Sequence, residues 1–159
     1  MVWKQRGRRI ELRNVEVEFV LKVGSEFLTE SALPNPLPPT GTSAGIDGAL
    51  CIRVDDEEFL GTRHWDCLDI VTHHVRSALD RALAGEEAEA AFPDTRLILT
   101  ITPEAEGSVT LSLEGVSVNA SAAALDRALD ACIQRFLALG PALHRTEALE
   151  ALERAAGAP

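Results

Sequence analysis

Most of the histidines, the residues best suited to acid–base chemistry near neutral pH, fall in one short stretch, residues 64–74. It holds His64, Asp66, His73 and His74, and so three of the four histidines of the chain. Histidine changes its charge near neutral pH, and a carboxylate close to it can serve as the matching acid or base. If the chain is an enzyme, these four residues are its candidate catalytic residues.

The same stretch offers one candidate pair of metal ligands, Asp69 and His73. They are four residues apart, which places both on one face of a helix. A metal site needs a third or fourth ligand, and Cys67 and His74 are about 10.5 Å apart along a helix, too far to share an ion. We therefore expect Asp69 and His73 to form a solvated pair, His74 to pack at the helix boundary, and no metal or cofactor to bind.

The three cysteines are predicted to be structural. Cys67 and Cys132 lie on apolar helix stripes and Cys51 lies in an apolar strand, whereas a catalytic thiol needs partial exposure beside a base. An odd number of cysteines without a C-x-x-C pair is typical of a reduced cytoplasmic protein. The sequence also lacks a nucleophile elbow, a P-loop, a dinucleotide fingerprint and an H-E-x-x-H motif. These absences favour a non-enzymatic protein.

The net charge of −10 indicates which partners suit the chain. A negative field repels nucleic acid and anionic lipid, and it attracts a basic protein. Aromatic residues make up 4% of the chain, which argues against a surface that stacks single-stranded bases. A basic arm at residues 1–9 is the exception to the acidity. We find no apolar run of about 18 residues and no secretory signal, so we expect no membrane partner and a cytoplasmic location.

The acidic residues gather in two runs, at 55–58 and 86–90, and a tryptophan at position 65 precedes a predicted helix. A tryptophan there either packs as a staple at the helix entry or, if exposed, anchors a partner. The candidate binding residues are therefore Trp65, Asp55, Asp56, Glu57, Glu58, Glu86, Glu87 and Glu89.

Alternating and helical patterns must position these side chains. Apolar residues alternate with polar ones at 15–23, 97–102, 108–114 and 116–118, and shorter strands are indicated at 49–54 and 59–60. The connections are too short for parallel crossovers, so the strands should be antiparallel. Helical stripes run from a cap at Asp66 to Gly85, and from a cap at Ser121 to Gly140. Residues 86–91 are expected to be an acidic connector.

The pattern predicts one α+β domain over residues 1–159, with an antiparallel sheet of about five to six strands covered by two amphipathic helices. A C-terminal helix with a weak apolar face is expected at 142–156, so that residues 142–159 pack weakly. Residues 24–48 are rich in proline and glycine. A connection this long is either a floppy loop or an ordered lid or binding segment.

From about residue 49 to 139, the order of elements resembles small bacterial immunity proteins of the WapI-type group and related uncharacterised actinobacterial families. The likeness lies in the short hairpin, the Trp65-Asp66 helix entry, the acidic connector, the paired strands and the closing helix after Ser121. It implies a non-enzymatic protein that binds and neutralises a cognate toxin. The segment 34–39, the basic arm and the third helix depart from that pattern.

Three functions follow from these observations. The first is an immunity-like domain that presents an acidic surface to a protein partner, such as a basic toxin domain. The second is a small enzyme or accessory protein of a biosynthetic pathway, with a pocket under the 24–48 loop. The third is a self-assembling scaffold, such as a homodimer, that uses residues 142–156 as its interface.

Overall fold

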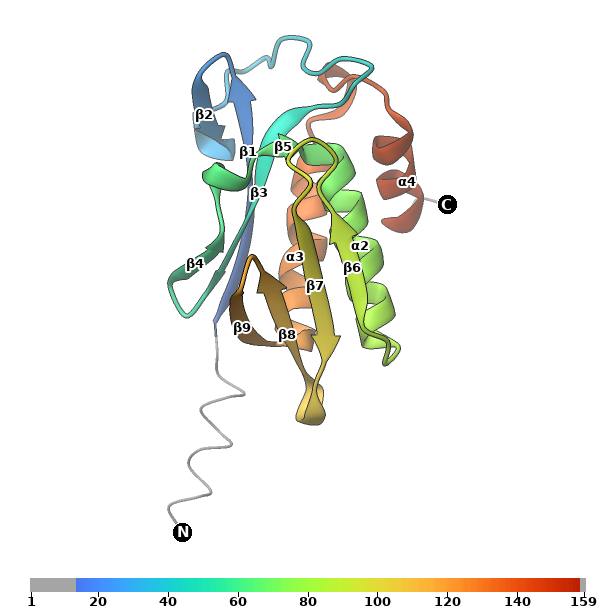
Figure 1. Cartoon of the computed structure of the whole chain (residues 1–159). Helices are drawn as coiled ribbons and strands as arrows, with labels where there is room; N and C mark the ends of the chain where they lie inside the picture. Colours follow the sequence, from blue (N-terminus) through green and yellow to red (C-terminus); the bar gives the residue numbers. More distant parts are fainter. Residues whose placement is uncertain (1–13, 158–159) are drawn as a thin grey trace.

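The computed structural model describes residues 14–157, so the predicted basic arm at residues 1–9 lies outside the described residues. The described chain forms two antiparallel sheets and three α-helices (Figure 1). The first sheet has the order β2-β1-β3-β4, with β5 paired to β3, and contains β1 (Val15–Val23), β2 (Glu26–Thr29), β3 (Asp47–Val54), β4 (Glu57–Leu60) and β5 (Asp66–Cys67). The second is a meander of β6 (Ala88–Ala91), β7 (Ile98–Pro103), β8 (Ser108–Leu113) and β9 (Val116–Ser121).

The α+β class predicted from the sequence is confirmed, but the strands divide between two sheets instead of forming one. Alternation along a strand shows which of its faces is buried, and it does not show which strands are neighbours. The helix between the two runs of strands separates them in the chain. Each run then pairs locally, and each sheet presents its own apolar face to the helices.

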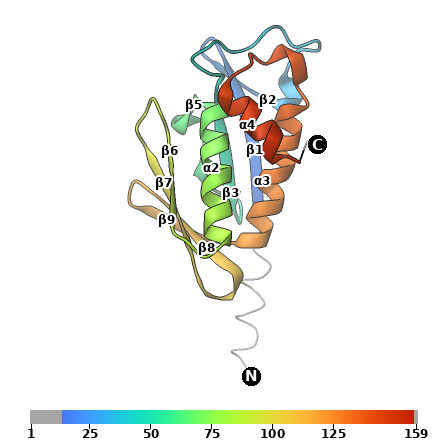
Figure 2. The same cartoon turned by 90° about the vertical axis from the view of Figure 1, so that its right-hand side faces the viewer.

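The helices α2 (Leu68–Leu83) and α3 (Ala122–Leu137) stand side by side, and α4 (Glu147–Ala155) lies across one end of the pair (Figure 2). The predicted stripe of α2 is buried, as Val71, Val75 and Leu79 show. The predicted cap of α3 is also present, because the Ser121 hydroxyl accepts a hydrogen bond from the Ala124 N–H at 3.2 Å. No helix within residues 14–157 is long and apolar enough to cross a membrane.

Each long helix packs mainly on the sheet formed by the other half of the chain. The helix α2 follows the first sheet in sequence but contacts chiefly β6 and β7 of the second. The helix α3 follows the second sheet but contacts chiefly β1 of the first, where Phe136 meets Phe19 edge to face at 5.4 Å between ring centroids. One continuous hydrophobic core joins both sheets and all three helices.

The helix α2 begins at Leu68 rather than at a cap formed by Asp66. Asp66 lies in β5, and its carboxylate accepts hydrogen bonds from the backbone N–H groups of Asp94 and Thr95 instead. A short polar residue before an apolar stripe is a capping signal. Here, however, the loop at residues 94–95 provides more hydrogen-bond donors to the Asp66 carboxylate than the start of the helix does. The predicted cap is therefore wrong.

The predicted acidic connector at residues 86–91 contains the edge strand β6. Its Ala88 and Ala90 are buried, while Glu89 between them and Ala91 after them are exposed. This is the alternation of a half-buried strand. Alanine and glutamate are poor strand formers, so the composition concealed the pattern.

The C-terminal segment packs more closely than the sequence predicted. Its helix covers Glu147–Ala155 rather than 142–156, and Leu149 and Leu152 are fully buried. The hydroxyl of Thr146 caps this helix by accepting a hydrogen bond from the Leu149 N–H at 3.1 Å. These two leucines, one turn apart, are enough to dock the helix, because only a narrow face of it covers the end of the α2–α3 pair.

The 24–48 segment is an ordered part of the fold. It contains β2 and the start of β3, and its middle runs beside residues 142–144 (Figure 1). The Thr40 N–H donates to the Ala142 carbonyl, and the His144 N–H donates to the Thr40 carbonyl, both at 2.7 Å. Ile46 near its end is completely buried. Of the two expectations for this segment, the floppy loop is wrong. The contacts that order the segment are long-range and were not visible in the sequence.

Candidate functional site

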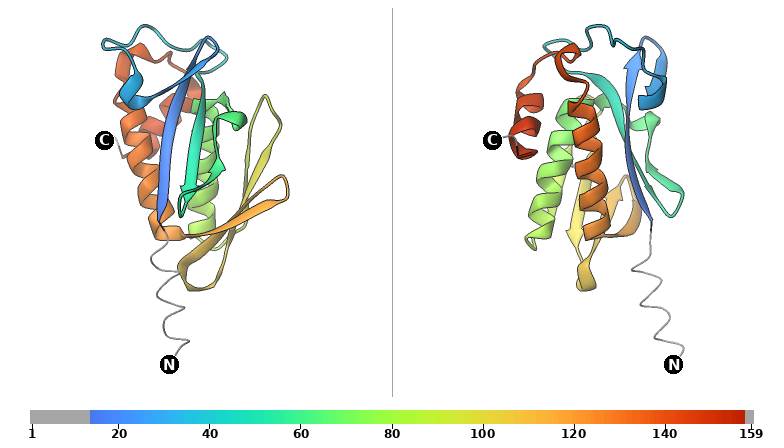
Figure 3. Two further views of the ribbon diagram at one scale, coloured as in Figure 1. Left: turned by 90° about the vertical axis from the view of Figure 1, so that its left-hand side faces the viewer. Right: turned by 180° about the vertical axis from the view of Figure 1, so that it is seen from behind.

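The outer face of the first sheet carries a cluster of acidic side chains. Glu16 and Glu18 on β1 alternate with buried core residues, so they point away from the helices. The register places Glu16 opposite Arg53 and Glu18 opposite Cys51 on β3, and it places Arg53 opposite Glu58 on β4. Both long helices lie behind this sheet when it is viewed from outside (Figure 3, left).

The β3–β4 hairpin adds three more exposed carboxylates at the end of this sheet, those of Asp55, Asp56 and Glu57. Asp55 and Asp56 have φ values of 51° and 67°, as a tight two-residue hairpin turn requires. This sheet and its hairpin turn thus carry six carboxylates and the guanidinium of Arg53, whose Nη2 donates to the Asp56 carbonyl at 3.0 Å. We call Glu16, Glu18, Arg53 and residues 55–58 the acidic face.

The thiol of Cys51 lies within this acidic face and is sensitive to its charge. Burial, and then the charges of Glu58 and Glu18, raise the pKa of Cys51 to about 11. Both carboxylates therefore act on one point between β1 and β4. A thiol with this pKa is almost fully protonated at neutral pH and is a poor nucleophile.

Trp65 lies at the other end of the same face. Lys22 shares the outward side of β1 with Glu16 and Glu18, and its Nζ stands 4.6 Å from the centroid of the Trp65 ring. Lys22 is six positions along the strand from Glu16, or about 20 Å at ~3.3 Å per residue. Trp65 is 37% exposed. Part of its ring is therefore accessible on the sheet face that carries the carboxylates.

The remaining predicted binding residues, Glu86, Glu87 and Glu89, do not belong to the acidic face. They lie at or before β6, the edge strand of the second sheet, beside α2. Glu86 pairs with Arg81 at 3.3 Å, and Glu87 accepts a hydrogen bond from the Thr102 hydroxyl at 2.8 Å. The two acidic runs of the sequence are thus two separate surfaces.

Two of the four candidate catalytic residues serve the fold. His64 is buried, and its Nδ1 accepts a hydrogen bond from the Gly61 N–H at 3.1 Å. Burial, and then the charge of Arg63, lower the pKa of His64 below its usual value. Asp66 is also buried, and its carboxylate accepts hydrogen bonds from Cys67, Asp94 and Thr95.

The Asp66 carboxylate is held in its charged form by these donors. Burial acts to raise the pKa of Asp66, but the hydrogen bonds from Thr95, Cys67 and Asp94 outweigh it and leave the pKa below its usual value. Ligand atoms of Asp66, Cys67 and Asp94 lie within 4.8 Å of one another. The Asp66 oxygens are already engaged, and burial with the charge of Asp94 raises the pKa of Cys67 to about 12. This group is thus a hydrogen-bonded corner of the fold.

Asp69 is not part of a solvated pair with His73, as the sequence predicted. Its side chain has no exposed surface. Oδ1 accepts a hydrogen bond from the Ile46 N–H at 3.0 Å, and Oδ2 accepts one from the Thr146 hydroxyl at 2.5 Å. Because these donors come from residues 23 and 77 positions away, no local pattern could reveal them. Asp69 joins α2 to the 24–48 segment and to the start of α4.

A cleft of about 670 Å³ opens between α2, the start of α4 and residues 43–44. His73 and His74 line it from α2, and Arg145 and Arg154 line it from the C-terminal segment. His74 Nδ1 donates to the Ala91 carbonyl at 2.7 Å, whereas His73 Nδ1 is buried and has no hydrogen-bond partner among residues 14–157. Burial, and then the charges of His74 and Arg154, lower the pKa of His73.

The candidate catalytic set is therefore divided. His73 and His74 share the α2–α4 cleft, while His64 lines a different one with Thr95 and Glu114. The 24–48 segment borders two clefts: its residues 43–44 line the α2–α4 cleft, and its residues 29–31 line another cleft with Glu18, Phe19 and Arg135. Cys132 is buried, and burial raises the pKa of its thiol to about 12. The Cys67 thiol donates to the Asp94 carboxylate at 3.6 Å, but with a pKa of about 12 it is a poor nucleophile at neutral pH.

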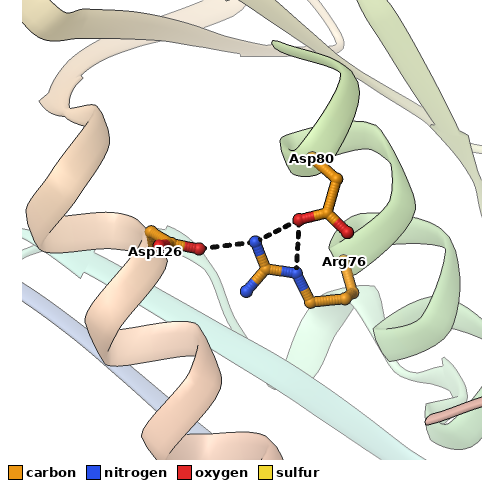
Figure 4. Close-up of polar contacts among 3 residues, drawn as sticks. All are labelled: Arg76, Asp80 and Asp126. Carbon is orange, nitrogen blue, oxygen red and sulfur yellow. Dashed lines mark hydrogen bonds and ion pairs between the residues drawn. The ribbon is translucent and has the colours of Figure 1, made fainter. Parts of the chain in front are cut away.

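Arg76 of α2 is a buried charge. Its guanidinium donates to Asp80 Oδ1 through Nε at 3.1 Å and through Nη2 at 2.6 Å, and Nη2 also meets Asp126 Oδ1 at 2.6 Å (Figure 4). Arg76 is only 9% exposed. Because Asp126 belongs to α3, this cluster ties the two long helices together and is structural.

Comparisons of the chain with protein-family models, with curated proteins and with solved structures find no match. The likeness to immunity proteins therefore stays a prediction, and any function must be argued from the geometry of the acidic face and of the α2–α4 cleft.

Proposed function

We propose that this chain is a non-enzymatic binding domain that docks a basic protein surface on its acidic face. One observation carries the proposal: the carboxylates of Glu16, Glu18 and Glu58 share a sheet face with the accessible ring of Trp65, three more stand at the hairpin turn of that sheet, and neither long helix covers that face. A basic toxin domain is the partner that the immunity-like pattern implies.

The two ends of this face suit different parts of an interface. Clustered carboxylates attract a basic partner over a distance and speed its association, and salt weakens that attraction. A partly exposed tryptophan provides apolar area with few rotatable bonds, which is typical of residues that dominate binding energy. The distance of about 20 Å between them fits an interface of ordinary size, which buries about 800 Å² per partner.

A capture experiment with two matched variants tests this proposal. The full chain is immobilised and exposed to native lysate at low salt. The face variant carries Glu16→Gln, Glu18→Gln and Glu58→Gln. The control variant carries Glu86→Gln, Glu87→Gln and Glu89→Gln, which removes the same charge from the other sheet.

We expect a basic protein to be retained by the wild type and by the control variant, to be lost from the face variant, and to elute as salt is raised. Equal retention by the face variant would show that binding occurs elsewhere. Failure of the wild type to retain any protein at low salt would count against the proposal as a whole.

The other two functions have less support. The apolar residues of α4, Leu149 and Leu152, are buried within the chain, so they are not available for a homodimer. An enzyme would need its acid and base in one place, and His64 and Asp66 are engaged in hydrogen bonds away from His73 and His74.

A further inference from the structure

We propose that the α2–α4 cleft is a binding site for a small anion, either a carboxylate or a phosphate group, held between Arg154 and His73. The site is separate from the acidic face and does not depend on the function proposed for that face.

The walls of the cleft are fixed by the fold. Asp69 receives hydrogen bonds from the Ile46 N–H and the Thr146 hydroxyl, so one buried carboxylate joins the three segments that form the cleft. Ala148 and Ala151 on α4 are small and leave its volume open. A cavity of about 670 Å³ is within the usual range of small-molecule sites, roughly 300–1,000 Å³.

Two polar groups in this cleft have no partner within residues 14–157. His73 Nδ1 is buried without a hydrogen bond, which costs free energy and calls for a ligand, an ion or a water. Arg154 makes no ion pair with any described residue, and its charge acts on the His73 ring. Arg145 differs, because Glu153 binds both of its terminal nitrogens.

The guanidinium of Arg154, unpaired within the described residues, is the charge that favours an anion in this cleft. The lining carries two guanidinium groups, those of Arg145 and Arg154, and two carboxylates, those of Asp69 and Glu147. Asp69 is engaged by its two donors. An anion placed between Arg154 and His73 would receive a charge-assisted hydrogen bond from the guanidinium and a second bond from the ring, in the manner of carboxylate and phosphate sites.

The test is an NMR titration of the full chain with inorganic phosphate and, separately, with sodium acetate at constant ionic strength. We expect saturable shifts of the His73 ring and the Arg154 side chain, and a higher pKa of His73 when the anion is bound, because a nearby negative charge stabilises imidazolium. Saturation with phosphate alone identifies a phosphate site, with acetate alone a carboxylate site, and with both a general anion site.

Arg154→Gln is the test variant and Arg127→Gln is its control. Both arginines are exposed, and Arg127 lies on α3 outside the cleft lining, so neither change should impair folding. Arg154→Gln should weaken anion binding about tenfold or more, as expected for loss of a charge-assisted hydrogen bond, and Arg127→Gln should leave it unchanged. The proposal is overturned if neither anion gives a saturable shift, or if the two variants bind the anion equally well.

Discussion

Replacing Asp69 with alanine should be one of the most destabilising single substitutions in this chain. The carboxylate is completely buried, and it is the acceptor for the Ile46 N–H at 3.0 Å and for the Thr146 hydroxyl at 2.5 Å. Alanine removes both acceptors and leaves a void where the carboxylate was. Ile46 is itself fully buried, so water cannot easily replace the lost bond to its N–H.

The size of the destabilisation follows from the free-energy cost of leaving each hydrogen-bond donor without an acceptor. A buried donor without an acceptor, here the Ile46 N–H, costs about 1–3 kcal/mol, and loss of the bond from the partly buried Thr146 hydroxyl costs about 1 kcal/mol more, so the free energy of unfolding should fall by roughly 2–4 kcal/mol. Domains of this kind are stable by about 5–15 kcal/mol in total. The melting temperature should therefore fall by roughly 10 °C, at about 2–4 °C per kcal/mol for a chain of this size.

Asp69→Asn is the matched control. Its amide keeps the shape of the side chain, offers an oxygen to the Ile46 N–H and offers an N–H to the Thr146 oxygen, so it should cost only about 1 kcal/mol. Urea unfolding followed by circular dichroism measures both variants. A loss of less than 1 kcal/mol for Asp69→Ala would refute the argument from abandoned donors. An equal loss for both variants would mean that the negative charge, and not the hydrogen bonds, supplies the stability.

Three further predictions address other parts of the fold. Cys51, with its pKa near 11, should react with iodoacetamide at pH 8 about a hundredfold more slowly than a free thiol, as mass spectrometry of the native and the urea-unfolded chain can measure; equal rates would contradict it. Arg76→Met and Asp126→Asn should each destabilise the chain by about 1–3 kcal/mol and show a coupling of at least 0.5 kcal/mol in a double-mutant cycle, and strict additivity would mean that the pair does not tie the helices. Burial lowers the pKa of His64 in the folded chain, so the unfolded chain binds a proton at this histidine at a higher pH than the folded chain does. The stability that His64 provides is therefore complete above about pH 6.5 and is lost as pH falls through the lowered pKa. His64→Asn keeps an acceptor for the Gly61 N–H and should reduce the loss of stability between pH 7 and 5, and an unchanged slope in urea titrations would argue against this role.

The sequence predicted the elements whose signals are local. The stripes of both long helices, the cap at Ser121 and the strands around residues 97–118 depend on neighbours within a few positions, and all are present. The strand β6 was missed because alanine and glutamate occupy a strand that their composition disfavours.

The functional surfaces were less accessible to prediction, because they depend on distant contacts. Glu58 was a candidate from its acidic run, but Glu16 and Glu18 were seen only as the polar side of a strand until the register placed them on one sheet face with Arg53 and Glu58. Asp69 was assigned to the surface, since its partners lie 23 and 77 residues away. Arg154 was not noticed, because its position beside His73 depends on the docking of α4.

Each long helix packs mainly on the sheet formed by the other half of the chain, and this has a consequence for folding during synthesis on the ribosome. The first sheet is synthesised early, but the helix that covers β1 is α3, which ends at residue 137. Until then the apolar side of β1, including Phe19, has no partner from its own half. The chain should therefore acquire protease resistance in a single late step, and a nascent chain stopped after α2 should depend on a chaperone to avoid aggregation.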